Sequence, residues 1–247
     1  MLGLPDGVTS CLFDLDGVLT QTAKVHAEAW KQMFDDYLRQ RAQQRGERFV
    51  PFDQERDYNE YVDGKPRYDG VRSFLRSRGI ELPQGTPADS PASETIDGLG
   101  NRKNELVLKL ISGRGVDPYE GSVLYANAAR DAGLRRAVVS SSTNCRDVLA
   151  AAKIDDLFEV IIDGNVAERD HLQGKPAPDT YLAGARALGV QAGQAAVFED
   201  ALAGVEAGRA GSFGLVVGVD RVGQADALHA HGADVVVSDL AELLQAP

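Results

Sequence analysis

The 247-residue chain has few cysteines, no excess of basic side chains and no long hydrophobic run. Its two cysteines, Cys11 and Cys145, do not have the spacing of metal-binding cysteine pairs. A two-cysteine chain of this size also needs no disulfide framework. We therefore expect both cysteines to be small buried residues.

Acidic residues outnumber basic ones: the chain has 37 Asp and Glu and 26 Lys and Arg, which gives a formal net charge of −11. This excess of acid disfavours nucleic acid or an anionic membrane as a partner, since both attract basic patches. The negative net charge does not exclude a small anionic substrate, because a local cationic pocket can exist on an acidic protein.

No stretch approaches the roughly 20 apolar residues of a membrane span. The first ten residues also lack the basic and apolar regions of a secretory signal, so we expect a cytoplasmic protein. An apolar content of 43% is ordinary for a globular protein, and the length suits one large domain or two smaller ones.

The most informative stretch is an apolar run that ends in two carboxylates, Asp14 and Asp16, followed by Gly17. Such a run predicts a buried strand, and side chains at i and i+2 of a strand point to the same side. Two carboxylates about 4 Å apart repel by about 4 kcal/mol at an effective dielectric near 20, so they need a shared proton, a lysine or a metal ion. The alternative is a solvated turn, for which Asp and Gly are ordinary residues.

The chain changes its pattern near residue 116, after which short apolar strands alternate with helices. This alternation favours a parallel sheet covered on both faces, and the first strand belongs with it. We thus predict a doubly wound, Rossmann-like α/β core of residues 1–20 and 113–247, with a helical insertion at 21–112. Strands are expected at 10–14, 136–140, 159–162, 195–198, 213–218 and 234–237. Helices are expected at 23–44, 71–79, 101–111, 122–132, 144–152, 178–188, 201–210, 223–231 and 239–245, with a Pro/Ser/Gly-rich connector at 83–98.

Three later stretches carry polar residues at strand ends or helix starts. Residues 140–144 read Ser-Ser-Ser-Thr-Asn at a predicted helix start, which suits either an anion site or plain helix capping. Lys175 stands in a proline-fixed loop and could neutralise phosphate or carboxylates, or could be a surface lysine. Glu199 and Asp200 repeat the opening pattern of an apolar strand that ends in carboxylates.

Each of these stretches is a weak signal alone, but the predicted sheet brings them to one rim. Hard oxygen ligands from two strand ends suit Mg²⁺. We therefore expect a magnesium-dependent phosphoryl-transfer site with an aspartate nucleophile. Its residues are Asp14, Asp16, Ser140, Lys175, Glu199 and Asp200.

These motifs occur in an order that resembles the haloacid dehalogenase (HAD) superfamily: Asp-Leu-Asp-Gly-Val from residue 14, a strand ending at Ser140, Lys-Pro-Ala-Pro-Asp from residue 175, and Glu199-Asp200. The helical insertion matches that family's small cap. Within it, the chain is similar to the β-phosphoglucomutase-like subfamily, on His26, Trp30, Arg67, Lys103 and residues 140–144. From the residues alone, the favoured interpretation is a half-buried histidine at position 26 and a snorkelling lysine at position 103.

The resemblance implies roles. Asp14 becomes an aspartyl phosphate and Asp16 is the acid and base. Magnesium is held by Asp14, the Asp16 carbonyl and Asp200, with Glu199 nearby, and Ser140 and Lys175 bind the transferring phosphate. Arg67 clamps the distal phosphate of a sugar bisphosphate, and His26 and Lys103 position Asp16 and the sugar. The remaining substrate-binding residues implied are Trp30, Ser142 and Asn144.

Two positions depart from the family pattern, with Gln21 in place of an acid and Thr143 in place of a lysine. They bear on sugar specificity and on the choice between mutase and phosphatase. The expectation is a monomeric β-phosphoglucomutase acting on a small phosphorylated sugar. A phosphatase that uses the same site is the nearest alternative, and a phospho-aspartate receiver domain is a remote one.

Overall fold

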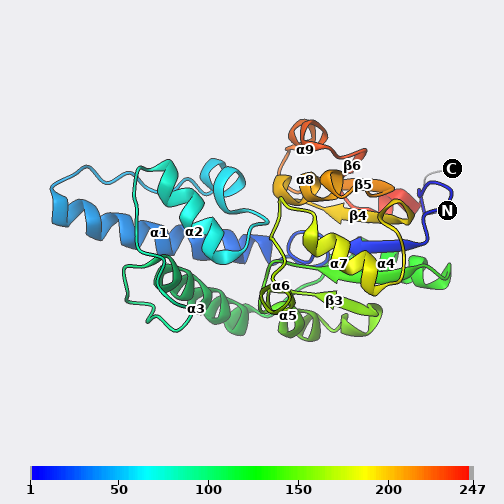
Figure 1. Cartoon of the computed structure of the whole chain (residues 1–247), viewed down its shortest axis with the longest axis horizontal. Helices are drawn as coiled ribbons and strands as arrows, with labels where there is room; N and C mark the ends of the chain where they lie inside the picture. Colours follow the sequence, from blue (N-terminus) through cyan, green and yellow to red (C-terminus); the bar gives the residue numbers. More distant parts are fainter. Residues whose placement is uncertain (1, 245–247) are drawn as a thin grey trace. The chain divides into compact units, whose positions relative to one another are not determined.

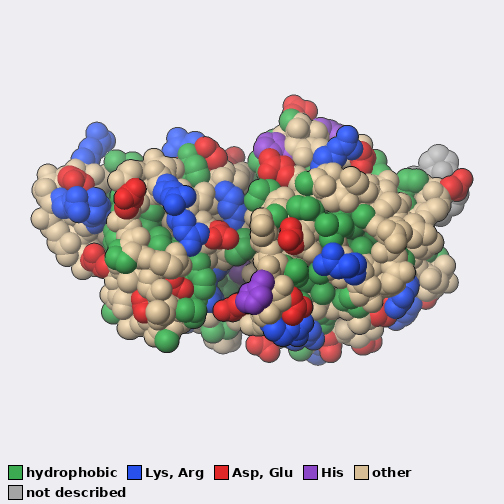
Figure 2. Space-filling view, in the orientation of Figure 1, with side chains coloured by type: hydrophobic (Ala, Val, Ile, Leu, Met, Phe, Trp, Pro, Cys, Tyr) green, Lys and Arg blue, Asp and Glu red, His purple; other side chains and the backbone are tan. Residues whose placement is uncertain are grey.

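The computed structural model describes residues 2–244, which form two compact units. The α/β unit contains the residues up to Gln21, Gly64–Pro66 and the residues from Val116 onward; the helical unit contains Thr22–Asp63 and Arg67–Gly115. Acidic and basic side chains are interspersed on the face shown in Figure 2. Across residues 2–244, no helix combines the length and the apolar character that a membrane span requires.

The α/β unit is built on a parallel sheet, as predicted (Figure 1). Its six strands within residues 2–244 lie in the order β3-β2-β1-β4-β5-β6, a doubly wound order that reverses between β1 and β4. In such sheets the reversal point is where ligands bind, at the carboxyl ends of the strands. The strands are β1 (Ser10–Phe13), β2 (Arg135–Val139), β3 (Val160–Ile162), β4 (Ala195–Glu199), β5 (Leu215–Val219) and β6 (Val235–Val237).

Helices cover this sheet because its strands are apolar on both faces. Every residue of β1, β4 and β5 is buried, and side chains such as Leu12, Val197 and Val216 share a core with Tyr181 and Leu228 of the helices. The helices are α4 (Glu120–Asp131), α5 (Cys145–Ala152), α6 (Gly164–Arg169), α7 (Asp179–Ala187), α8 (Leu202–Ala210) and α9 (Ala225–His231). Short 3₁₀ turns are η2 (Asp155–Leu157), η3 (Ala192–Gln194) and η4 (Leu240–Leu244).

The helical unit packs three α-helices around an aromatic core. Phe34 of the first helix contacts Phe74 at a ring-centroid distance of 4.2 Å and stacks on Phe52 at 5.2 Å. These rings form one core with buried aliphatic side chains such as Met33, Leu75 and Leu99. Its elements are α1 (Ala23–Arg45), the π-helical turn η1 (Tyr58–Val62), α2 (Arg67–Ser77) and α3 (Ile96–Arg114).

Some boundaries differ from the predictions. Helix α3 begins at Ile96 inside the predicted connector, because the Thr95 hydroxyl caps it by accepting the Gly98 N–H at 2.9 Å. Helix α6 was not predicted; Asp163 caps it by accepting the Val166 N–H. A 3₁₀ turn takes the place of the predicted last helix, whose residue 245 lies outside the described residues.

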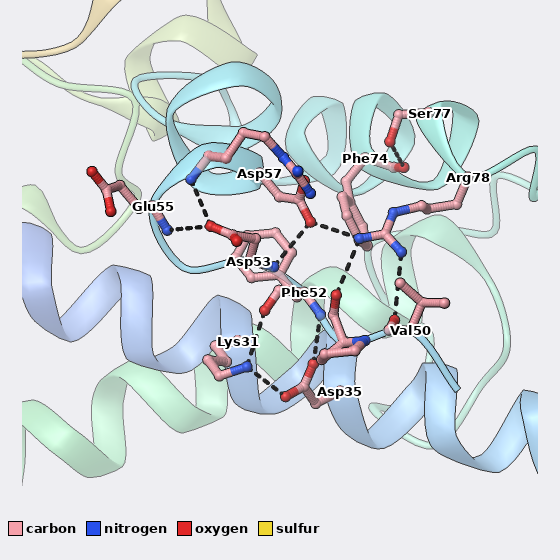
Figure 3. A network of polar contacts seen from close by, with 12 residues as sticks. Lys31, Asp35, Val50, Phe52, Asp53, Glu55, Asp57, Phe74, Ser77 and Arg78 are labelled. Carbon is pink, nitrogen blue, oxygen red and sulfur yellow. Dashed lines mark hydrogen bonds and ion pairs between the residues drawn. The ribbon is translucent and has the colours of Figure 1, made fainter. Parts of the chain in front are cut away.

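The segment between α1 and α2 is fixed by the carboxylates of Asp35 and Asp57 (Figure 3). Asp35 of α1 accepts the Phe52 N–H at 2.8 Å and the Lys31 ammonium at 2.8 Å. Asp57 accepts the Asp53 N–H at 2.9 Å and the Arg78 guanidinium at 2.6 Å. These bonds attach an irregular segment to both helices.

The α/β unit also pairs the two ends of the helical insertion. The Gln21 N–H donates to the Asp117 carbonyl at 2.9 Å, and Thr20 forms an antiparallel bridge with Pro118. The Tyr119 N–H then donates to the Leu19 carbonyl at 2.9 Å. The chain therefore leaves this unit and returns to it at the same place.

Candidate active site

Asp14 and Lys175 form a buried ion pair at the carboxyl end of β1. The Asp14 N–H donates to the Phe198 carbonyl at 2.9 Å, which extends the pairing of β1 with β4 and fixes the backbone of Asp14. Only 2% of the Lys175 surface is exposed. Its Nζ donates to Asp14 Oδ1 at 2.6 Å, to Glu199 Oε1, and to the Val139 carbonyl of β2 at 3.3 Å. One lysine therefore joins the ends of three neighbouring strands.

Protein donors also surround the Glu199 carboxylate. Besides Lys175, the Tyr181 hydroxyl donates to Oε1 at 3.0 Å and the Ala201 N–H donates to Oε2 at 3.0 Å. Gly204 of α8 packs against this carboxylate so closely that a Cβ there would lie 1.8 Å from Oε1. The absence of a side chain at Gly204 thus leaves space for the Glu199 carboxylate that pairs with Lys175.

Burial and the neighbouring charges shift the pKa values of Asp14 and Lys175. Burial raises the pKa of Asp14 well above its usual value, against the opposing effect of the Lys175 ammonium. Burial would lower the pKa of Lys175, but Asp14 and Glu199 outweigh it and raise this pKa above its usual value. The site therefore keeps a fixed positive charge beside its acids.

Asp14, Glu199 and Asp200 each offer a carboxylate oxygen, and these oxygens lie within 4.8 Å of one another. All three residues are buried, and carboxylates this close suit a hard divalent cation. Gly17 has φ +88°, and a Cβ at this position would lie 1.7 Å from Asp200 Oδ2. A glycine is therefore required where the turn after β1 meets Asp200.

Asp16 lies on this turn, which two hydrogen bonds of Thr20 close. The Gly17 N–H donates to the Thr20 carbonyl at 2.8 Å, and the Thr20 hydroxyl donates to the Leu15 carbonyl at 3.2 Å. Asp16 is only partly buried, whereas Asp14 is buried. The two acids therefore have different environments, although they are two residues apart.

Ser140 directly follows β2, next to the Val139 carbonyl that accepts from Lys175. It is 2% exposed, and its hydroxyl accepts the Ser142 N–H at 3.1 Å. The Ser142 hydroxyl in turn accepts the Asn144 N–H at 3.2 Å. These bonds shape a tight loop of hydroxyls directly after β2.

Residues Gly64–Pro66 pack within the α/β unit, next to two of these loops. The Ser141 hydroxyl donates to the Gly64 carbonyl at 2.8 Å. A Cβ on Gly174, directly before Lys175, would lie 2.1 Å from the Pro66 ring. The segment thus lies against the neighbours of both Ser140 and Lys175.

In the helical unit, the structure brings together three of the four predicted cap residues. Lys103 is 5% exposed; its Nζ lies 2.8 Å from His26 Nδ1 and 4.8 Å from the centre of the Trp30 ring. The contacts of Arg67 are with Tyr68. Its guanidinium lies over the Tyr68 ring and donates to the Tyr68 hydroxyl at 3.1 Å, and this hydroxyl donates to Asn101 Oδ1 at 3.0 Å.

Three residues that donate hydrogen bonds to residues of the site were not predicted from the sequence: Tyr181, Arg221 and Gln224. Tyr181 follows the lysine motif on α7, and a buried tyrosine hydroxyl needs a partner, which was the available signal. Arg221 and Gln224 donate to the backbone carbonyls of Gly17 and Asp200, at 2.8 and 3.0 Å. Nothing in a single sequence identifies a backbone carbonyl as the partner of a distant side chain.

Comparison with known proteins agrees with this geometry. The β-phosphoglucomutases of Mycobacterium bovis and Mycobacterium tuberculosis are 58% identical to the chain, over 99% of this chain and 94% of theirs. The β-phosphoglucomutase of Bacillus subtilis is 30% identical, over 94% of this chain and 90% of its own. A solved β-phosphoglucomutase from Clostridium difficile has a TM-score of 0.72 at 25% identity, covering 96% and 93% of the two chains.

A family model described as haloacid dehalogenase-like hydrolase matches residues 8–211. The match includes β1, β2 and β4 and every residue of the Asp14–Lys175–Glu199–Asp200 cluster. The chain belongs to the haloacid dehalogenase-like hydrolase family.

Proposed function

We propose that the chain is a magnesium-dependent β-phosphoglucomutase, which interconverts β-glucose 1-phosphate and glucose 6-phosphate through a 1,6-bisphosphate. One observation carries the proposal: 58% identity to two β-phosphoglucomutases extends over 99% of the chain. The likeness therefore includes both the unit with the acidic cluster and the helical unit. We propose that the enzyme acts as a monomer in the cytoplasm on small phosphorylated sugars.

The buried Asp14 is the proposed nucleophile. A carboxylate oxygen of Asp14 forms a bond to phosphorus as the bond from phosphorus to the sugar oxygen breaks, and Asp16 donates its proton to that oxygen. In the second half-reaction Asp16 takes the proton of the acceptor hydroxyl, which attacks the aspartyl phosphate and frees Asp14. The Lys175 ammonium, 2.6 Å from Asp14 Oδ1, favours the ionised form of Asp14 that a nucleophile needs.

Asp14, Asp200 and the Asp16 backbone carbonyl would hold magnesium, with Glu199 close by. When bound, the ion would offset the negative charge of the carboxylates and of the phosphoryl group. Glu199 already accepts bonds from Lys175, Tyr181 and Ala201, so its own task is to fix the lysine. Lys175 and Ser140 would then bind the oxygens of the transferring phosphoryl group.

The helical unit would recognise the rest of the substrate. Arg67 presents a planar guanidinium suited to the distal phosphate. The Lys103–His26 pair, packed on Trp30, would position Asp16 and the sugar. Ser142 and Asn144, in the loop after β2, would contribute further polar contacts.

The test is an assay of the purified chain with β-glucose 1-phosphate, Mg²⁺ and a catalytic amount of β-glucose 1,6-bisphosphate, followed by phosphorus NMR. We expect glucose 6-phosphate to accumulate without inorganic phosphate. The α anomer serves as the matched control, which a β-specific mutase leaves unchanged.

The same assay separates the alternatives. Release of inorganic phosphate without glucose 6-phosphate would overturn the mutase proposal and assign the site to a phosphatase, in which water accepts the phosphoryl group. Slow labelling of Asp14 without any turnover would be the behaviour of a phospho-aspartate receiver.

A further inference from the structure

The turn between β5 and α9, residues 220–224, contacts both acidic stretches of the site. Arg221 Nε donates to the Gly17 carbonyl at 2.8 Å, on the turn that follows β1. Gln224 Nε2 donates to the Asp200 carbonyl at 3.0 Å, directly after β4. Two side chains three residues apart thus contact the segments that carry Asp14, Asp16 and Asp200.

The turn is itself rigid. Asp220 Oδ1 accepts the backbone N–H groups of Val222, Gly223 and Gln224 at 3.1, 2.7 and 2.8 Å. The Asp220 N–H donates to the Val237 carbonyl of β6 at 2.8 Å. Gly223 supplies the positive φ, +83°, that this conformation requires. The positions of Arg221 and Gln224 are therefore set by the sheet.

The Arg221 side chain makes contacts through Nε, Nη1 and one face of its guanidinium. Its guanidinium stacks over the Tyr119 ring with 3.6 Å between the guanidinium carbon and the ring centre. Nη1 donates to the Ser238 carbonyl at 2.7 Å, and the side chain is 13% exposed. A side chain so confined cannot move without breaking several contacts, so it fixes the Gly17 carbonyl.

Gly17 transmits this constraint to Asp200. The α-carbon of Gly17 lies directly against the Asp200 carboxylate, since a Cβ there would overlap Oδ2. Arg221 fixes the Gly17 carbonyl, and Gln224 fixes the backbone carbonyl of Asp200 itself. A small displacement of either would change the separation between the Asp14 and Asp200 oxygens.

We propose that Arg221 and Gln224 are positioning residues that set the spacing of the Asp14 and Asp200 carboxylates for a divalent cation. The proposal rests on the proposed function for its choice of Mg²⁺, but not for the sugar. Partners that orient metal ligands in this way typically change metal affinity or activity about 10- to 100-fold when removed.

The experiment measures Mg²⁺ affinity by titration calorimetry, with the metal alone, for the full-length wild type, Arg221→Ala, Arg221→Lys and Gln224→Ala. We expect dissociation constants about 10-fold or more higher for the two alanine variants. Arg221→Lys should recover part of the loss, because an ammonium can replace one of the guanidinium bonds. Val222→Ala is the control in the same turn, since Val222 is 58% exposed.

Thermal unfolding of every variant separates positioning from folding. Gln224→Ala removes one bond and should melt close to the wild type. Variants that melt lower but bind Mg²⁺ as the wild type does would overturn the proposal, and so would alanine variants within about 2-fold of the wild-type affinity. Because calorimetry needs no sugar, failure of the mutase assay and failure of this proposal are separate results.

Discussion

The α/β unit and the helical unit assemble their polar clusters in different ways. In the α/β unit, a parallel sheet places the ends of β1, β2 and β4 side by side, so Asp14, Val139 and Glu199 meet around Lys175. In the helical unit, the Lys103–His26 pair depends on how α1 packs against α3. A sheet edge therefore specifies a site by topology, whereas a helix pair specifies it by packing.

This difference predicts that single changes at the sheet edge abolish function, while changes in the helical unit reduce it. Asp14→Asn removes the proposed nucleophile and should lower turnover by at least about 10⁴-fold, as for other catalytic nucleophiles. The phosphorus NMR assay measures the loss. Asp131→Asn, on the exposed end of α4, is the control. Residual turnover above one hundredth of wild type would refute the role of Asp14.

Lys175→Met should abolish turnover and also destabilise the fold. It leaves the buried Asp14 and Glu199 carboxylates without their cation, and breaking such a buried pair costs about 3–5 kcal/mol. Urea unfolding followed by circular dichroism measures the change. A variant as stable as the wild type would show that Lys175 is not the residue that compensates these charges.

Lys103→Met tests the helical unit. The methionine keeps the contact with Trp30 but removes the charge, so we expect kcat/KM to fall about 100-fold with little change in stability. Lys109→Met, an exposed residue on the same helix, is the matched control. A loss as large as that of Asp14→Asn would contradict the contrast between the units.

Asp57→Asn should affect stability and leave kcat unchanged. Burial would raise the pKa of Asp57, but hydrogen bonds from the Asp53 N–H, Arg78 and Arg56 hold this pKa below its usual value. We expect a loss of about 2 kcal/mol near pH 7, since hydrogen bonds to a charged group are worth about 1.5–3 kcal/mol. The exposed Asp36→Asn is the control.

The pH dependence of this variant follows from the sign of the shift. A depressed pKa stabilises the fold fully above the unfolded pKa, about 3.9, and this stabilisation is lost as pH falls through the folded pKa. The difference in unfolding free energy between wild type and Asp57→Asn should therefore be largest above about pH 5. It should decrease progressively as the pH falls below about 4. Thermal melts across this range measure it, and a constant gap would refute the charged role of Asp57.

Tyr68→Phe should have the smallest effect. It removes the hydroxyl that accepts from Arg67 and donates to Asn101, worth about 0.5–1.5 kcal/mol. If Arg67 binds the distal phosphate, KM for the bisphosphate should rise about 2- to 10-fold at unchanged kcat. A change in kcat at unchanged KM would show that Arg67 does not bind the distal phosphate. Tyr61→Phe, in the same unit, is the control.

The α/β fold could be predicted because the alternation of apolar strands and helices is a local pattern that favours a parallel sheet. The strand ends of such a sheet meet at one edge, which brings Asp14 and Glu199 together, whereas the role of Lys175, in a loop, followed from the family resemblance. Arg221 and Gln224 could not be predicted, since their partners are the backbone carbonyls of Gly17 and Asp200. Such bonds depend on three-dimensional position and leave no trace in residue type.

The helical unit was harder to predict for a related reason. The start of α3 was hidden by the Pro and Ser residues before it, although Thr95 and Gly98 form an ordinary cap. The segment before α2 is held by Asp35 and Asp57, which form hydrogen bonds with residues far away in the sequence. No periodic sequence pattern marks these bonds. Tertiary bonds of this kind override local composition.

The pairing of Gln21 with Asp117 has a consequence for how such proteins diversify. Since the two ends of the insertion lie one hydrogen bond apart, the sheet does not depend on the length of what they enclose. Loop-closure cost grows slowly with length, by about 0.6 kcal/mol for each doubling. We therefore expect that the junction of Gln21 with Asp117 accommodates insertions of other lengths without loss of the sheet.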